Sequence, residues 1–375
     1  MAAPQVVHSG IALRPEEVEA LASARRASRF LAALPQPLFY LAVRLTLAKS
    51  RRPAQRDGSL GWPTASAVVR TAFSVDAGFG PCPVTCYYRK NLPPGPHPLF
   101  YFVHGGGFIA GSSRVNENLL VRLAEEVDVV CAAIDYHLAP EVRFPGAVEE
   151  CTAGVIALAR GGGRPGGLDA GGDPAGLDAG GAAPGGLDAG GRGVGGAGGG
   201  GTAHGVNAPG IDPDGIVLCG DSAGGNLAAA TALVLGRRHG LRPQAQALLY
   251  PVTDLRSLAT PSYLAPDPEN RAMRKFIRAC RHLYARAPAD YADPLFSPAA
   301  TTPNYDPEPT ATLLLLAGHD GLLGDGLLYA DHQADLGAEV RTVVYDNAHH
   351  AFINQLGHSG IAEHVFGEIL QLIKG

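Results

Sequence analysis

After residue 67, the sequence alternates between short apolar runs and longer segments with helical character. The later apolar runs are unbroken, which is typical of strands buried on both faces of a mostly parallel sheet. The alternation predicts a three-layer α/β fold with an eight-stranded sheet flanked by helices. The predicted strands are residues 69–75, 83–88, 99–104, 127–135, 216–221, 245–251, 312–318 and 340–345. The predicted helices are residues 116–126, 146–160, 223–239, 327–336 and 360–373.

Two segments outside this rhythm suit a cap over the sheet. Residues 15–47 have a helix-like character, so residues 1–67 are predicted to form an N-terminal helical cap segment, which precedes a main α/β domain at residues 68–375. Residues 255–294 follow a predicted strand and carry a basic, helix-like sequence. They predict a second cap segment, inserted into the main domain.

Residues 161–205 form an insertion that is dominated by glycine and repeats Leu-Asp-Ala-Gly-Gly. So little apolar surface cannot offset the backbone entropy of ordering, about 1 kcal/mol per residue or more, and we expect disorder. A calcium-binding repeat is the sharper alternative, because Asp169, Asp178 and Asp188 recur. Their spacing is nine and then ten residues and the calcium-binding consensus is absent, which favours a flexible insertion.

The net charge and the cysteine spacing indicate which ligands the protein is expected to bind. A formal net charge of −5 and a pI near 6.2 provide no basic surface for a nucleic acid. Small, neutral or weakly charged ligands fit better. The six cysteines are scattered without a CxxC pair, so we expect buried apolar thiols and no metal site. The oligomeric state is left open, a homo-oligomer included.

The N-terminal region shows no charged segment followed by a continuous apolar run, so we expect a cytoplasmic protein without a secretory signal. Residues 30–48 are apolar and nearly long enough to cross a bilayer. Pro35, Pro37 and Arg44 argue against a spanning helix. Flanking arginines leave a weaker alternative, a segment resting on an anionic membrane surface, but we expect a cap element without membrane association.

The segment that carries the most chemistry is Ile216-Val-Leu-Cys-Gly-Asp-Ser-Ala-Gly-Gly, where an apolar strand meets a turn and then a helix. It contains Gly-x-Ser-x-Gly at Gly220, Ser222 and Gly224. A serine on a tight strand-to-helix turn needs small neighbours, because side chains two residues away on either side would collide. The helix also directs its positive end at a developing oxyanion. Ser222 is therefore the candidate nucleophile.

A second motif, His104-Gly-Gly-Gly-Phe108, directly follows a predicted strand. It resembles the HGGG-type oxyanion loop of lipases and esterases. Its glycines let backbone N–H groups approach a substrate oxygen. The predicted donors are the N–H groups of Gly106, Gly107 and Ala223, with Gly105 setting the turn.

A catalytic triad also needs an acid and a histidine, in the chain order Ser, Asp, His. Asp320 follows the predicted strand at residues 312–318, and His349 and His350 follow the last strand. The carboxyl ends of parallel strands meet at one edge of a sheet, where open α/β sheets place their sites. The spacing cannot decide between the two adjacent histidines. Asp325 and Asp254 are alternative acids, and His319 precedes the acid on the wrong strand for the base.

These motifs, together with Asp135-Tyr-His-Leu-Ala-Pro-Glu141 and Phe144-Pro145, resemble the hormone-sensitive-lipase-like (bacterial type IV) esterases of the α/β-hydrolase superfamily, and bacterial acetyl esterases most. The resemblance covers residue 99 to the C-terminus apart from the glycine-rich insertion. In that family the catalytic histidine precedes a small residue and Phe, which maps to His350. The family acid begins an Asp-Pro-Leu motif, which maps to Asp320 although Gly321 replaces the proline.

The resemblance implies a carboxylic ester hydrolase that works through an acyl-enzyme, with a capped site, short acyl chains and no cofactor. Its partner would be a small-molecule ester. An amidase or acyl-peptide hydrolase is an alternative, because the same groups can expel an amine. A non-catalytic ligand receptor is another, resembling the gibberellin receptors that have lost the triad histidine. Retention of His349 and His350 argues against a receptor.

Overall fold

The computed structural model describes residues 5–15, 17–18, 33–35, 38, 67–161, 202–204, 208–306 and 308–375. Within these ranges a single sheet has the strand order β1-β10-β9-β8-β7-β4-β5-β3-β2-β6. Pairing is antiparallel only where β3 meets β2 and β5, and where β2 meets β6. The strands are β1 (Gln5–Ser9), β2 (Val68–Asp76), β3 (Cys82–Arg89), β4 (His97–Val103), β5 (Val130–Ile134), β6 (Thr202–His204), β7 (Ile211–Asp221), β8 (Ala245–Leu249), β9 (Ala311–His319) and β10 (Val340–His349).

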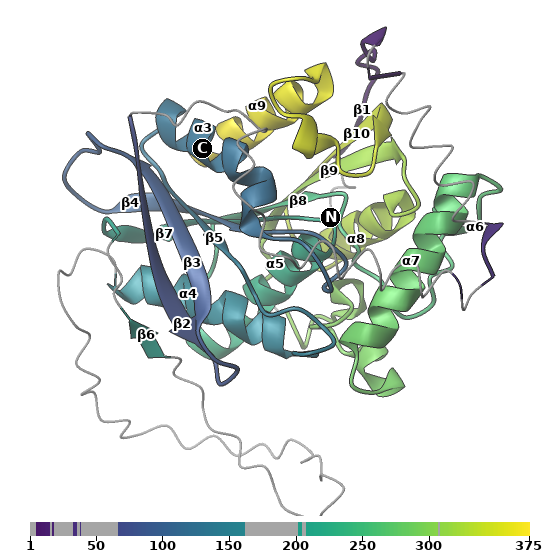
Figure 1. Cartoon of the computed structure of the whole chain (residues 1–375), viewed down its shortest axis with the longest axis horizontal. Coiled ribbons are helices and arrows are strands. Elements are labelled where there is room, and N and C mark those ends of the chain that lie inside the picture. The colour runs from purple at the N-terminus through teal and green to yellow at the C-terminus, as the bar shows by residue number, and fades with distance from the viewer. Residues whose placement is uncertain are drawn as a thin grey trace, which may run out of the picture.

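Helices cover both faces of this sheet (Figure 1). Helices α3 and α9 pack on one face, and α4, α5 and α8 pack on the other. Side chains of β4 alternate between the two cores: Tyr101 faces the α4 side and Phe102 the α3 side, both fully buried. The helices are α3 (Glu117–Glu126), α4 (Gly146–Gly161), α5 (Ala223–Val234), α6 (Pro261–Leu264), α7 (Pro268–Tyr284), α8 (Leu323–Asp335) and α9 (Gly360–Lys374).

The α/β class and all eight predicted strands are confirmed, and two short edge strands add to them. β1 pairs in parallel with β10, and β6 pairs with β2. Within the predicted N-terminal helical cap segment at residues 1–67, Gln5–Ser9 form a strand, because the outer edge of β10 offers backbone hydrogen bonds to an extended segment. Figure 1 shows β1 beside β10.

Most of the two unusual segments lies outside the described residues. The apolar stretch at residues 30–48 is described only at residues 33–35 and 38. Of the glycine-rich insertion, Gly161 ends α4 and residues 202–204 form β6, so the insertion prediction was too wide at both ends. Its repeated aspartates lie outside the described residues. Among the helices that the structure describes, none combines the length and apolar character needed to cross a membrane; cytoplasmic location stays a prediction.

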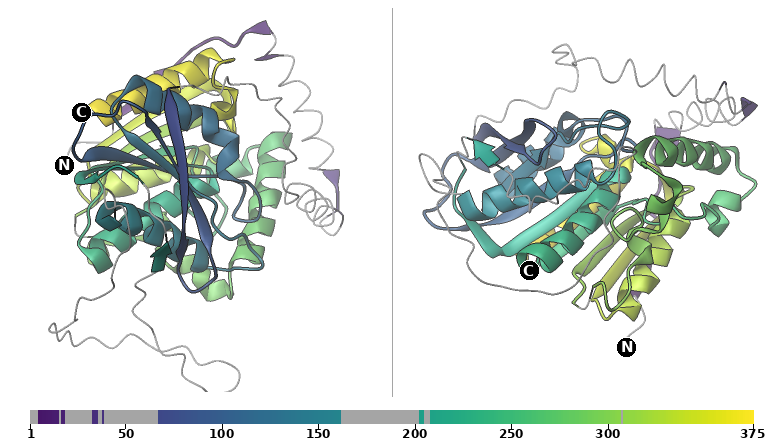
Figure 2. Two further views of the ribbon diagram at one scale, coloured as in Figure 1. Left: turned by 60° about the vertical axis from the view of Figure 1, so that its left-hand side comes forward. Right: turned by 90° about the horizontal axis from the view of Figure 1, so that it is seen from below.

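Residues 255–294 form two helices that lie outside both helical layers, α6 and the longer α7 (Figures 1 and 2). Helix α7 begins at Pro268, and the Asp267 side chain accepts a hydrogen bond from the Glu269 N–H at 2.7 Å, which caps the helix. The helix is strongly amphipathic. Buried residues such as Ile277 and Cys280 pack against the sheet domain.

Candidate active site

Ser222 occupies the turn between β7 and α5, with φ of 55° and ψ of −118°. This conformation is sparsely populated for residues other than glycine and costs about 1–3 kcal/mol. The glycines on either side make it sterically feasible. A Cβ at Gly220 would overlap the carbonyl oxygen of Gly224, and a Cβ at Gly224 would overlap that of Val103. The Gly-x-Ser-x-Gly pattern is therefore a requirement of backbone packing at this turn.

Three side chains at the carboxyl edge of the sheet form one hydrogen-bonded chain. His350 Nδ1 donates to Asp320 Oδ2 at 2.6 Å, and His350 Nε2 accepts from the Ser222 hydroxyl at 3.0 Å. Each of the three directly follows the last residue of its strand, β7, β9 or β10. The sheet order, in which β9 and β10 are adjacent and only β8 separates β9 from β7, brings them together.

The electrostatics of this chain favour a charged imidazole. Burial favours the neutral ring, but the charge and hydrogen bond of Asp320 outweigh it and raise the pKa of His350 above its ordinary value. His349 does not contact Ser222 in the hydrogen bonds described. Its Nδ1 pairs with Glu269 Oε2 of α7 at 2.8 Å, and its ring stacks on His319 at 5.1 Å.

The alternative acids have other partners. Asp254 forms a two-pronged ion pair with Arg256 at 2.8 and 3.1 Å. Asp325 is fully buried, and Tyr263 donates to it at 3.4 Å. Burial and the Asp254 charge raise the pKa of Asp325 well above its ordinary value. The described hydrogen bonds connect neither carboxylate to His350.

The loop that carries Asp320 is braced by the segment around α6. Its Gly321 carbonyl accepts from the Ser262 hydroxyl at 2.6 Å, and Ser262 Oγ accepts from the Gly324 N–H at 2.9 Å. A Cβ at Gly321 would lie 3.1 Å from Met273 of α7. The missing proline of the family motif therefore coincides with close packing of α7. Sequence reasoning missed Ser262, because only the fold brings it to the acid loop.

The predicted oxyanion residues lie together at the start of α5. The Gly105 N–H donates to Asp221 Oδ1 at 2.7 Å, which occupies that donor. Gly106 and Gly107 have φ of 117° and 65°, the left-handed region that favours glycine. Ala223 is the first residue of α5, where N–H groups have no intrahelical acceptor. Gly106, Gly107 and Ala223 thus remain the candidate donors, and Gly105 anchors the loop.

From sequence, Asp221 is expected to stabilise the serine turn beside it; the structure shows that it also ties the oxyanion loop to that turn. Besides Gly105, it accepts from Asn116 Nδ2 at 3.4 Å. Burial raises the pKa of Asp221 to about 6, against the lowering effect of the Gly105 hydrogen bond and of the His350 charge. A buried acid that sits between the serine turn and the oxyanion loop therefore ionises close to neutral pH.

Aromatic residues pack against both ends of the oxyanion loop. His104 stacks on Tyr136 at 4.3 Å, and the Tyr136 hydroxyl donates to the His104 carbonyl at 3.0 Å. Phe108 stacks on Tyr284 of α7 at 4.2 Å. Phe108, Tyr136 and Phe352 are each at most 5% exposed, so they belong to the core.

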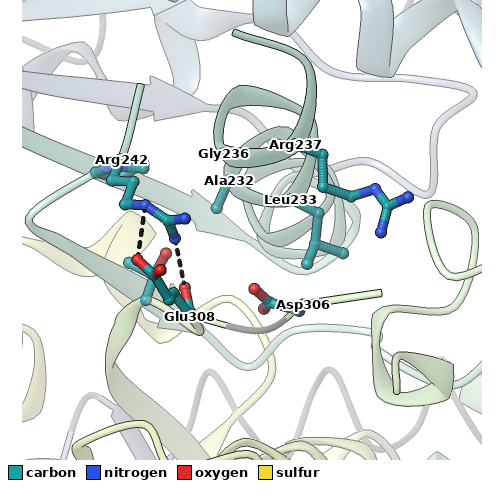
Figure 3. A pocket seen from close by; sticks show the side chains of 9 residues that line it. Ala232, Leu233, Gly236, Arg237, Arg242, Asp306 and Glu308 are labelled. Atoms are coloured by element: carbon teal, nitrogen blue, oxygen red, sulfur yellow. Dashed lines mark hydrogen bonds and ion pairs between the residues drawn. The ribbon is translucent and has the colours of Figure 1, made fainter. Parts of the chain in front are cut away.

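A small pocket lies at the opposite edge of the sheet (Figure 3). It is lined by the end of α5 and by the residues that precede β8 and β9. Its charged groups already have partners: Arg242 pairs with Glu308 at 3.0 Å, and Arg237 donates to the Tyr305 carbonyl at 2.5 Å. None of the residues that line this pocket belongs to the Ser222 site.

Comparisons with known proteins agree with this geometry. Residues 100–354 match the alpha/beta hydrolase fold family, which is more than half of the chain. Ethyl acetate hydrolase of Pseudomonas putida is 29% identical over 67% of this chain and 65% of its own length. Mouse hormone-sensitive lipase is 31% identical over 47% of this chain and 18% of its own length. The chain thus spans less than two thirds of these relatives.

Solved structures show the same fold. An esterase of the archaeon Pyrobaculum calidifontis aligns with a TM-score of 0.66 at 23% identity, over 97% of this chain and 98% of its own. An esterase of the fungus Rhizomucor miehei aligns with a TM-score of 0.67 at 22% identity, over 92% and 91% of the two chains. The family match over residues 100–354 shows that the chain belongs to the α/β-hydrolase fold family, and hormone-sensitive lipase is among its relatives.

Proposed function

We propose that this protein is a serine carboxylesterase that hydrolyses short-chain acyl esters, with Ser222 as nucleophile, His350 as general base and Asp320 as the acid. The observation that carries the proposal is the continuous hydrogen-bonded chain from Asp320 through His350 to Ser222. A strained turn presents that serine at the start of α5, where N–H groups have no intrahelical acceptor. The glycine loop that carries Gly106 and Gly107 supplies the other candidate N–H donors.

In this mechanism His350 Nε2 takes the Ser222 proton while Oγ attacks the ester carbonyl. The N–H groups of Gly106, Gly107 and Ala223 stabilise the oxyanion, each contributing about 3 kcal/mol. The tetrahedral intermediate expels the alcohol, which takes the proton from His350. Water then repeats the sequence on the acyl-enzyme and releases the acid.

The preference for short acyl chains rests on α7. We propose that this helix belongs to a cap formed by residues 255–294 together with residues 1–67. A Cβ at Gly107 would lie 2.6 Å from Cys280 Sγ and 3.0 Å from the Phe276 ring. Side chains of α7 thus lie directly against the oxyanion loop and leave little room for a long chain there. A relative whose name specifies ethyl acetate is consistent with this preference.

The test is hydrolysis of p-nitrophenyl esters from acetate to palmitate by the full chain and by Ser222→Ala. We expect turnover of the short esters and a loss of about 10⁶-fold in kcat in the variant, at an unchanged melting temperature. His350→Ala should lose activity to a similar extent. The matched control, His349→Ala, removes the neighbouring imidazole and should lose far less.

The alternatives give different results. An amidase would cleave the matching p-nitroanilide as well as the ester. A receptor would bind esters without turnover and would not react with a phosphonate at Ser222, which mass spectrometry detects. Equal activity of Ser222→Ala and the parent protein would end the proposed mechanism.

A further inference from the structure

A cysteine, a histidine and a glutamate converge away from the triad, on the part of the sheet formed by β3 and β5. Cys82 begins β3, His137 lies in the loop after β5, and Glu150 lies in the early part of α4. One ligand atom of each, the Cys82 Sγ, a His137 ring nitrogen and a Glu150 carboxylate oxygen, lies within 4.8 Å of the other two. Residues far apart in the sequence thus bring three different metal-binding groups to one place.

The cluster is enclosed, but one side reaches solvent. Cys82 and Glu150 are fully buried, whereas the His137 side chain is 35% exposed. Glu150 accepts from the backbone N–H of His137 at 2.8 Å, and its other oxygen contacts His137 Nδ1. The Cys82 thiol donates to the Asp135 carbonyl at 3.3 Å. Water can therefore approach from the imidazole side.

The donor set matches a borderline-soft divalent cation. Zn²⁺ binds thiolate at about 2.3 Å and imidazole or carboxylate at about 2.0–2.2 Å in a tetrahedron, which requires only small movements of groups already this close. A thiolate and a carboxylate would neutralise the dication, so no uncompensated charge would be buried. Burial raises the pKa of the Cys82 thiol, so metal binding would release its proton to solvent.

We propose that Cys82, His137 and Glu150 form a structural metal site for Zn²⁺ or a similar cation, with solvent water in the fourth position. The metal site lies apart from the proposed triad, but the loop that carries His137 contacts the oxyanion loop. Tyr136, next to His137, supports His104, and the Ala139 N–H donates to the Phe108 carbonyl at 2.9 Å. A bound metal would hold the loop that supports both ends of the oxyanion motif.

The competing explanation is an ion pair between His137 and Glu150 that holds the loop without metal. His137→Arg separates the two, because arginine keeps a charged partner for Glu150 but has no lone pair to bind a metal. Under the proposal this variant folds normally in the presence of a chelator and loses metal binding.

The experiment is titration of the full chain with Co²⁺ after chelator treatment, followed by absorption spectroscopy. We expect one equivalent of Co²⁺, a thiolate-to-cobalt charge-transfer band, and displacement of that band by Zn²⁺. Cys82→Ser and His137→Arg should bind at least about a hundredfold more weakly. Cys86→Ala changes another buried cysteine of the same strand and should retain the band.

Absence of stoichiometric Co²⁺ and Zn²⁺ binding by the parent protein would overturn the proposal. So would binding without the thiolate band, or a band that persists in Cys82→Ser. If Cys82→Ser does not fold, His137→Arg decides by the same criterion. These readouts do not require esterase activity, so failure of the metal site and failure of the proposed function are distinguishable.

Discussion

The serine turn and the acid loop both present a residue of the proposed triad at the end of a strand, yet they are held in different ways. At the serine turn, backbone contacts determine the geometry, since Gly220 and Gly224 leave no room for a Cβ. The acid loop has hydrogen bonds of its own, from the Leu322 N–H to Asp320 Oδ1 at 3.0 Å. It also depends on Ser262, 59 residues earlier in the chain.

The serine turn is thus defined mainly by neighbouring residues in the sequence, whereas the acid loop is held by contacts with distant elements. The glycine pattern of the serine turn lies within five consecutive residues, although Gly224 also packs against the Val103 carbonyl of the neighbouring strand β4. The acid loop depends on two elements, α6 through Ser262 and α7 through Met273. Changes in the cap segment should therefore affect Asp320 and His350 while leaving Ser222 in place.

The largest expected effect tests the serine turn. Gly224→Ala introduces a Cβ that overlaps backbone atoms, which cannot move aside like a flexible side chain. We expect a loss of about a hundredfold or more in kcat/KM and about 1–3 kcal/mol of stability, measured by ester hydrolysis and urea unfolding. Gly236→Ala is the matched control, because a Cβ there meets no atom within 4 Å. If Gly224→Ala behaves like that control, the turn is not held by sterics.

A smaller effect is expected when the acid loop loses its brace. Ser262→Ala removes the hydroxyl that joins Gly321 and Gly324, so we expect about 1–2 kcal/mol less stability and roughly tenfold lower kcat/KM. Ser262→Thr keeps the hydroxyl and should retain most of the activity. Unchanged kinetics in Ser262→Ala would mean that the loop positions Asp320 without help from α6.

The contact between Gly321 and α7 should have a still smaller effect. Gly321→Ala places a Cβ 3.1 Å from Met273, and we expect a few-fold loss of activity. Met273→Ala creates space, so the double variant should recover much of what Gly321→Ala loses. Double-mutant kinetics measure this coupling; strictly additive effects would show that α7 does not press on the acid loop.

The smallest expected effect is a shift of the pH profile of kcat/KM, which should differ between a variant of the acid loop and a variant of the serine turn. The base must be neutral, so kcat/KM falls as pH drops through the pKa of His350, which Asp320 raises above its ordinary value. Ser262→Ala should weaken the Asp320 contact, lower that pKa and move the acid limb to lower pH. Gly224→Ala should leave the limb in place. If the acid limb moves in both variants, the serine turn and the acid loop are not held independently.

The same pKa has a consequence for stability. His350 has a higher pKa in the folded protein than in the unfolded chain. Its contribution to stability is therefore full below the unfolded pKa and is lost as pH rises through the folded value. In His350→Ala this part of the pH dependence of urea unfolding should disappear.

Much of the fold and most of the candidate site could be predicted because their signals are local. Buried strands require continuous apolar runs, and the serine turn requires glycines at fixed offsets, so Ser222 and the oxyanion glycines are visible in short segments. His349 and His350 could not be separated by spacing, because adjacent residues on a strand end differ only in which way the side chain points. In the structure His349 points to Glu269 of α7 and His350 to Ser222.

The edge strands, the contact of Asp221 with Gly105 and the brace by Ser262 could not be predicted, since each depends on a partner far along the chain. β1 is extended only because β10 has an unpaired edge, and Asp221 anchors Gly105 from 116 residues away. The Cys82, His137 and Glu150 cluster has the same origin.

The sequence by itself thus determined the α/β class, the strand-and-helix order and the candidate nucleophile, because these depend on periodicity and on steric limits within a few residues. The resemblance to a known family mapped the candidate base to His350 and the candidate acid to Asp320, whereas residue spacing alone left both open; the tertiary structure brings these two side chains to Ser222, and only it decided what holds the acid loop. Hydrogen bonds act over about 3 Å, and only folding brings groups from distant strands that close.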